Sequence, residues 1–160
     1  MSKAAILSLV ALTLAAPSPA RAEDNDALLR ALGGATAAYL YEAHQKVGIV
    51  ADARAKKLYE PEVCDKELQV TLNILKVVDK QMADLVKSDI SADEKKTVRS
   101  IRAIAAKQIK SAEGLKAYWE GKDKDDLETY TTSRAEGWTD LKKLMGLKDN
   151  PGGVKPKTED

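Results

Sequence analysis

Apolar residues recur along most of this chain with the spacing of helices. Between residues 23 and 148 they return every three or four positions, and no stretch shows the alternating pattern of strands. Helix-forming residues such as Ala, Leu, Lys and Glu dominate this part, and Pro61 is the only proline between Glu23 and Asn150. The pattern therefore predicts an all-α protein.

The first long helix is predicted over residues 35–59. A shorter helical piece at residues 26–32 precedes it, and Gly33 and Gly34 lie between the two. Because glycine lowers the stability of a helix interior, we expect a kink or break at this pair. The apolar stripe of the long helix consists of Leu40, Val47, Ala51 and Leu58, beside Tyr39, Ala43 and Val50.

The second helix is predicted from Pro61 to about Lys87. Proline suits the first helical position, where its missing N–H leaves no hydrogen bond unmade. The apolar positions of this helix form a wide stripe, which favours a helix buried between two neighbours. One row of the stripe contains Val63, Val70, Ile74, Val77 and Leu85, and a second contains Leu68, Leu72, Leu75, Met82 and Val86.

Two further helices follow. Ser91 and Glu94 have the spacing of a capping box, which predicts the start of a third helix that ends near Glu120, before Gly121. The acidic run 123–128 predicts the start of a fourth helix, since carboxylates stabilise a helix N-terminus. The inward positions are Val98, Ile101, Ala105, Ile109, Ala112, Leu115 and Trp119 in the third helix, and Leu127, Tyr130, Trp138, Leu141, Leu144 and Met145 in the fourth.

Four helices of similar length with short connections predict an antiparallel up-down-up-down four-helix bundle, with residues 26–32 as a short extra N-terminal piece. We expect this domain to span residues 23–148. At 1.5 Å per residue, His44 would share one level of the bundle with Val77, Ala105 and Trp138. Residues 149–160 are rich in Pro, Gly and charge, which predicts a disordered tail.

Residues 1–22 have the pattern of a signal peptide. Lys3 precedes an apolar run at residues 4–16, and the small-residue site Ala20-Arg21-Ala22 follows two prolines. The run is shorter than the roughly 20 residues that span a bilayer, and no later stretch is longer. We therefore expect cleavage after Ala22, a periplasmic or secreted protein, and no transmembrane segment after cleavage.

Charge narrows the choice of partner. Removing residues 1–22 takes away Lys3 and Arg21 and no acidic residue, so the remaining net charge is close to zero. This argues against nucleic-acid binding, which needs a basic face. The third helix is nevertheless basic outside, through Lys95, Lys96, Arg99, Arg102, Lys107 and Lys110. This face either docks a protein or an anionic envelope polymer, or is a solvated face balanced by acidic neighbours.

His44 is the only histidine, and it lies on an apolar stripe. It is either a ligand to haem or a metal, or a histidine at the edge of the core. Covalent haem attachment is excluded because there is no Cys-x-x-Cys-His, and a ferritin-type di-iron site needs two histidines. We expect no cofactor as the first interpretation, and a haem- or metal-binding bundle as the alternative.

Cys64 is the only cysteine, and it falls in the first turn of the second helix. Three interpretations remain open: a buried apolar residue, a thiol activated by the helix N-terminus, and a disulfide between two chains. The protein is accordingly expected to be a monomer or a Cys64-linked dimer.

No nucleophile or phosphate-loop motif is present, so we expect no enzymatic activity. The stretches 74–81 (ILKVVDKQ) and 117–123 (AYWEGKD) resemble small exported helical-bundle proteins of bacteria that have no assigned activity. The resemblance implies an exported bundle and carries over no site residue. The sequence thus favours a non-enzymatic binding or structural module of the cell envelope.

Overall fold

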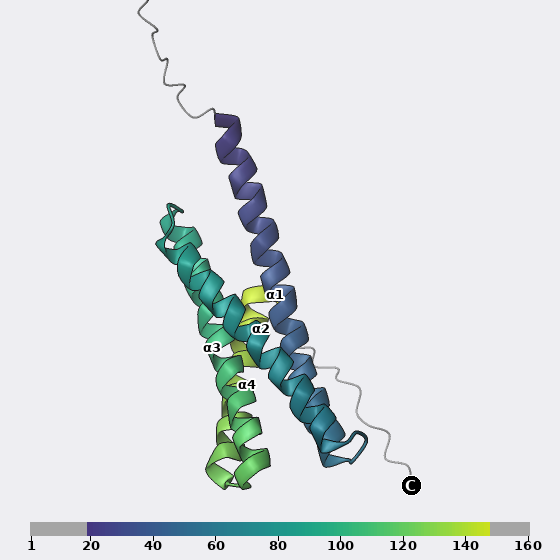
Figure 1. Ribbon diagram of the computed structural model, residues 1–160. Coiled ribbons are helices and arrows are strands. Elements are labelled where there is room, and N and C mark those ends of the chain that lie inside the picture. Colours follow the sequence, from purple (N-terminus) through teal and green to yellow (C-terminus); the bar gives the residue numbers. More distant parts are fainter. Residues whose placement is uncertain (1–18, 148–160) are drawn as a thin grey trace, which may run out of the picture. The chain divides into compact units, whose positions relative to one another are not determined.

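The computed structural model describes residues 19–147, with side chains from residue 27 onward. This part is all-helical, as predicted, and consists of α1 (Pro19–Ala55), α2 (Pro61–Lys87), α3 (Ala92–Gly121) and α4 (Lys124–Met145), with no strand between residues 19 and 147 (Figure 1). Within the same range, no helix is long and apolar enough to cross a membrane. Most of the predicted signal peptide, residues 1–18, and the predicted tail 149–160 lie outside the described residues.

Helix α1 is continuous where a break was expected. Gly33 and Gly34 are both helical, so the expected break in the helix at this pair is absent. Each glycine weakens a helix by only about 1 kcal/mol relative to alanine, and the flanking Ala31, Ala35 and Ala37 are strong helix formers. The chain divides into two compact units between Leu32 and Gly33, and the core described below belongs to the second unit.

The C-terminus of α1 comes earlier than predicted, at Ala55. Lys57 adopts a left-handed conformation with φ 54°, and Leu58 N–H donates to the carbonyl of Ala53 at 2.8 Å. This bond closes the helix end in the manner of a Schellman motif, although the left-handed residue is not glycine. Leu58 consequently lies outside the helix and is exposed, contrary to its predicted place in the apolar stripe.

The other helix ends follow local signals. Helix α2 has the predicted bounds, with Pro61 at its start. Ser91 and Glu94 form the predicted capping box of α3: Ser91 N–H donates to the Glu94 carboxylate at 2.6 Å, and Glu94 N–H donates to the Ser91 hydroxyl at 3.2 Å. Hydrogen bonding with Ser91 lowers the pKa of the Glu94 carboxyl group. Helix α3 runs slightly further than predicted, to Gly121; the left-handed residue that follows is Lys122 (φ 61°), and Asp123 then caps α4.

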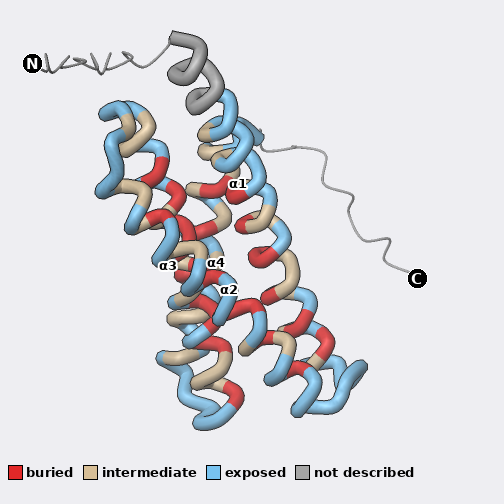
Figure 2. The backbone as a smooth tube through the Cα atoms, turned by 45° about the horizontal axis from the view of Figure 1, so that its top comes forward, coloured by how far each residue is buried: buried red, intermediate tan, exposed pale blue. Residues whose placement is uncertain are grey.

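Two clusters of buried side chains form the core, and all four helices contribute to them. Helix α3 packs against both α2 and α4, and Figure 2 shows buried positions recurring along these helices. The first cluster contains Leu40, Ala43, Leu75, Met82, Val98, Ile101, Ile104, Ala105 and Leu141. The second contains Val47, Val50, Ala53, Cys64, Leu68, Leu72, Ala112, Leu115 and Trp119.

The predicted burial of the wide α2 stripe is correct for only one of its two rows. Leu68, Leu72, Leu75 and Met82 are buried, whereas the row that begins with Val63 is exposed over most of its length. Neighbouring helices cover one side of α2, so the second row has no place in the core. The inward face of α4 also ends sooner than predicted at both ends, since Leu127 and Met145 are exposed.

Candidate functional site

An exposed apolar ridge runs along α2. We define the ridge as Val63, Val70, Ile74 and Val77, which are 47%, 42%, 42% and 52% exposed. Residues three, four and seven positions apart lie on one side of a helix, so these four form a stripe about 20 Å long. A single exposed valine is ordinary, but a stripe of β-branched residues rimmed by charge is typical of an interaction surface.

The ridge faces outward because α1 and α3 hold α2 on its other sides. Toward α3, the Lys76 ammonium lies 2.7 Å from the Glu113 carboxylate, and Lys116 donates to the Gln69 side chain at 3.0 Å. Toward α1, Lys46 pairs with Glu67 at 2.6 Å. These contacts flank the buried row, which leaves the ridge uncovered by any helix of the described part.

Unpaired positive charge borders the ridge on one side. Lys66 and Lys80 each follow a ridge valine by three residues and are therefore its neighbours on the helix surface. Both are exposed, and neither forms an ion pair with another residue in the range 27–147. On the other border, Lys46 neutralises Glu67 and its hydrogen bond lowers the pKa of that carboxyl group. The ridge thus has the free ammonium groups of Lys66 and Lys80 along one edge, where the carboxylates of Glu62 and Asp84 lie four residues before and after them.

The basic face of α3 separates into bound and unpaired side chains. Arg102 pairs with Asp79 of α2 at 3.0 Å, and Lys107 pairs with Asp140 of α4 at 2.7 Å. These two residues connect helices. The remaining predicted residues form no ion pair with the described side chains: Lys95, Lys96, Arg99 and Lys110.

His44 lies in the core and stacks on an aromatic ring. It is 7% exposed, and its ring centroid lies 5.0 Å from that of Trp138 at an interplanar angle of 18°. Burial, and then the charge of Arg134, lower the pKa of the ring to about 4. The predicted level holds for His44 and Trp138, which stack, whereas Val77 points out of the core. No group of three or more potential metal ligands exists among the described side chains.

Sequence reasoning missed two polar residues beside His44. Gln108 is buried, and its Nε2 donates to the carbonyl of Leu40 at 2.9 Å. Arg134 crosses from α4 and donates to the carbonyl of His44, over the position of Gly48. A side chain at Gly48 would collide with the guanidinium group, so this glycine permits the contact. The spacing of Gln108, between Ala105 and Ala112, already indicated an inward position.

Cys64 is 1% exposed and contacts the second core cluster. A disulfide between two chains would require the first turn of α2 to leave that core. Of the three interpretations of this cysteine, the geometry favours the buried apolar residue.

The chain was compared with known proteins by family, by sequence and by structure. No protein family, curated protein or solved structure matches it. The resemblance to exported helical-bundle proteins stays a prediction, and function has to be inferred from the residues themselves.

Proposed function

We propose that this protein is an exported, non-enzymatic binding module of the cell envelope, built as an antiparallel up-down-up-down four-helix bundle. Its α2 ridge docks a helical segment of a partner protein. The signal-peptide pattern of residues 1–22 supports export. The observation that carries the proposal is the ridge, an apolar stripe left outside a core that is already complete.

Contacts between helices support the antiparallel arrangement. From Lys107 to Ser111 the numbering rises along α3, while the partner positions on α4 fall from Asp140 to Tyr130. At the junction of α1 and α2, Arg54 pairs with Asp65 across the short connection, and its guanidinium lies 4.2 Å above the ring of Trp119. Neighbouring helices that meet in this order run in opposite directions.

The chemistry of the ridge defines the partner. Burying a half-exposed Val or Ile side chain contributes about 1 kcal/mol, so four such residues supply a useful part of a binding energy. The free ammonium groups of Lys66 and Lys80 then favour a partner whose apolar stripe is edged by Asp or Glu. An amphipathic helix with that pattern fits both features.

A second copy of this chain fits less well. If two ridges met in antiparallel fashion, the same edge of each helix would face the other copy. In a pairing centred near residue 73, about two thirds of the way along the ridge, Lys66 would lie opposite Lys80 of that copy, and like charges at this position oppose association. Charge complementarity therefore favours a different protein as the occupant.

Two synthetic helical peptides test the proposal by fluorescence anisotropy. Both carry the same Leu/Ile stripe, and one has Glu and the other Lys beside it. The Glu-edged peptide should bind about tenfold more tightly, which corresponds to roughly 1.4 kcal/mol. Replacing Val70 and Val77 by Ser should weaken both peptides.

The charge-reversed variant Lys66→Glu/Lys80→Glu should invert the preference between the peptides. The matched control is Lys95→Glu/Lys96→Glu, which makes the same change of charge on α3. This control should leave the preference for the Glu-edged peptide unaltered. Equal binding of both peptides to all these proteins would contradict the proposal. So would a dimer in sedimentation that dissociates in the Val70→Ser/Val77→Ser variant, because a second copy would then occupy the ridge.

A further inference from the structure

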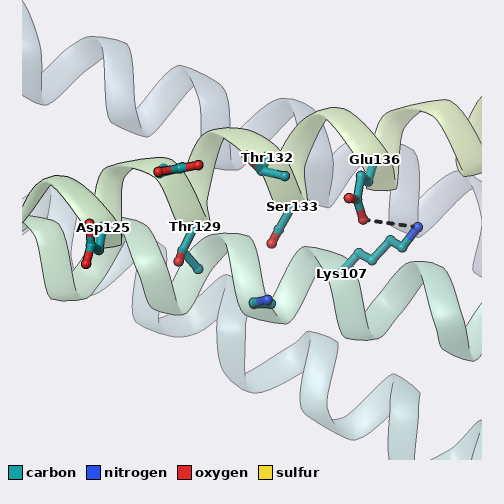
Figure 3. A pocket seen from close by; sticks show the side chains of 8 residues that line it. Lys107, Asp125, Thr129, Thr132, Ser133 and Glu136 are labelled. Carbon is teal, nitrogen blue, oxygen red and sulfur yellow. Dashed lines mark ion pairs between the residues drawn. The ribbon is translucent and has the colours of Figure 1, made fainter.

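A polar groove lies between α3 and α4, away from the ridge. It has a volume of about 520 Å³, which falls in the range of small-molecule sites. Helix α3 contributes lysines to its lining, and α4 contributes hydroxyl groups and carboxylates (Figure 3). The groove therefore offers both signs of charge together with neutral hydrogen-bonding groups.

The hydroxyl groups in this groove differ from others on the same helix. Thr131 and Thr139 each donate at 3.0 Å to the carbonyl four residues earlier, which satisfies them within α4. Thr129, Thr132 and Ser133 form no hydrogen bond with the described residues. Ser133 is only 5% exposed, and Figure 3 shows its hydroxyl and that of Thr129 directed between the two helices. Ser133 is thus a largely buried residue whose hydroxyl opens into the groove without a hydrogen-bond partner among the described residues, which makes it a position for a ligand atom.

The cations of the groove have different roles. Lys107 forms an ion pair with Asp140 at 2.7 Å and a second one with Glu136 at 3.4 Å. Figure 3 marks the pair with Glu136. Lys110 forms no ion pair with any described residue. It lies on α3 between Lys107 and Ser111, and the partners of those two residues bracket residues 131–139 of α4. The Lys110 ammonium and the Ser133 hydroxyl therefore line the same part of the groove.

An unpaired carboxylate lies farther along α4. Glu128 lines the groove and forms no ion pair with the described side chains. It precedes Ser133 by five residues, which corresponds to about 7.5 Å along a helix. The groove thus presents a cationic and hydroxylic end and an anionic end, separated by somewhat more than one turn.

We propose that this groove binds a short zwitterionic peptide. Its carboxylate contacts Lys110 and the Ser133 hydroxyl, and its ammonium group contacts Glu128. An extended chain covers 3.3–3.6 Å per residue, so a peptide of two or three residues spans about 7–10 Å and matches the separation of the two ends. A simple anion would use only one end and would leave Glu128 without a partner. The proposal is independent of the ridge, because different helices and residues carry it.

Titration of the ¹⁵N-labelled protein with trialanine tests this site by NMR. We expect shifts of the amide signals of residues 129–133, with an affinity in the millimolar range that is typical of small polar ligands. N-acetyl-trialanine and trialanine amide each lack one charge, and each should bind about tenfold more weakly. The backbone dispersion of the spectrum reports in parallel whether each variant is folded.

Variants assign the two ends separately. Lys110→Gln should weaken trialanine and N-acetyl-trialanine alike, whereas Glu128→Gln should weaken trialanine and leave N-acetyl-trialanine unchanged. Lys96→Gln and Glu120→Gln are exposed changes of the same kind on α3, outside the groove, and should have no effect. The proposal fails if trialanine shifts no groove signal. It also fails if inorganic phosphate shifts these signals as strongly as trialanine does and Glu128→Gln is without effect, because the groove would then be a simple anion site.

Discussion

Two faces of α2 are equally aliphatic and have opposite environments. Leu75 is 0% exposed and contacts the first core cluster, while the adjacent Ile74 is 42% exposed and lies on the ridge. The next residue, Lys76, pairs with Glu113 of α3. Of these three consecutive residues, Ile74 lies on the outer surface, Leu75 lies in the core, and Lys76 lies at the border between α2 and α3.

This difference shows that apolar periodicity identifies a helix but does not say which of its apolar rows is covered. Coverage depends on where α1 and α3 lie, and those positions follow from packing over the whole bundle. A row that no neighbouring helix reaches adds little to stability. Its apolar residues are then better explained by docking than by folding.

The largest expected effect separates the two faces. Leu75→Ala should lower the free energy of unfolding by about 2–5 kcal/mol, because it removes buried contacts and leaves a cavity. Ile74→Ala should cost less than about 1 kcal/mol, since the side chain is already half in water. Urea unfolding of both variants measures the difference. Similar losses would place Ile74 in the core and remove the distinction.

Acid should destabilise the buried face through His44. Its pKa is about 4 in the folded protein and 6.5 in a free side chain, so between these values the unfolded chain binds more protons. Stability is then complete above about pH 6.5 and declines as the pH falls toward 4, by about 3 kcal/mol. Urea unfolding at pH 7.5 and 4.5 tests this, and His44→Gln should reduce the pH-dependent loss by the same amount. An identical loss in both proteins would show that other groups cause it.

The contact of α3 with α4 should depend on a small residue. A Cβ at Gly114 would lie 2.9 Å from the backbone nitrogen of Tyr130 and 3.0 Å from the Asp126 carbonyl oxygen. Because backbone atoms cannot move aside as a side chain can, Gly114→Ala should cost about 1–3 kcal/mol. Gly121→Ala is the control, since no atom lies within 4 Å of a Cβ there. Thermal unfolding compares the two, and an unchanged Gly114→Ala protein would mean that the helices lie farther apart.

The smallest effect is expected at the border with α3. Lys76 and Glu113 are both about half exposed, and ion pairs of this kind contribute roughly 0–1 kcal/mol. Lys76→Gln should therefore change the free energy of unfolding by less than 1 kcal/mol, and the change should shrink further in high salt. A loss comparable to that of Leu75→Ala would mean that charge, and not apolar packing, holds α2 on α3.

Local signals in the sequence predicted local features. Pro61 and the Ser91–Glu94 box have their effect within one helical turn, and the structure has the expected helix starts. The ends at Lys57 and Lys122 could not be predicted in the same way, because a lysine in a left-handed conformation is imposed by the chain that follows.

Features that depend on register were beyond the sequence pattern. The shared level of His44 and Trp138 followed from counting residues along the helices, but the stacking of their rings did not. The groove around Ser133 depends on how α3 and α4 are aligned along their axes. The sequence of either helix alone does not determine that alignment. For the same reason, periodicity placed Val77 in the core when it belongs to the ridge.

The most direct test of the central claim is photo-crosslinking in the compartment where the protein resides. A photoreactive side chain is placed at Val70, on the ridge, or at Ala106, an exposed position on α3. We expect one discrete adduct with another protein from position 70, none from position 106, and loss of the adduct in the Lys66→Glu/Lys80→Glu background. The same adducts from both positions, or an adduct that persists after charge reversal, would contradict the assignment of the ridge as a docking surface.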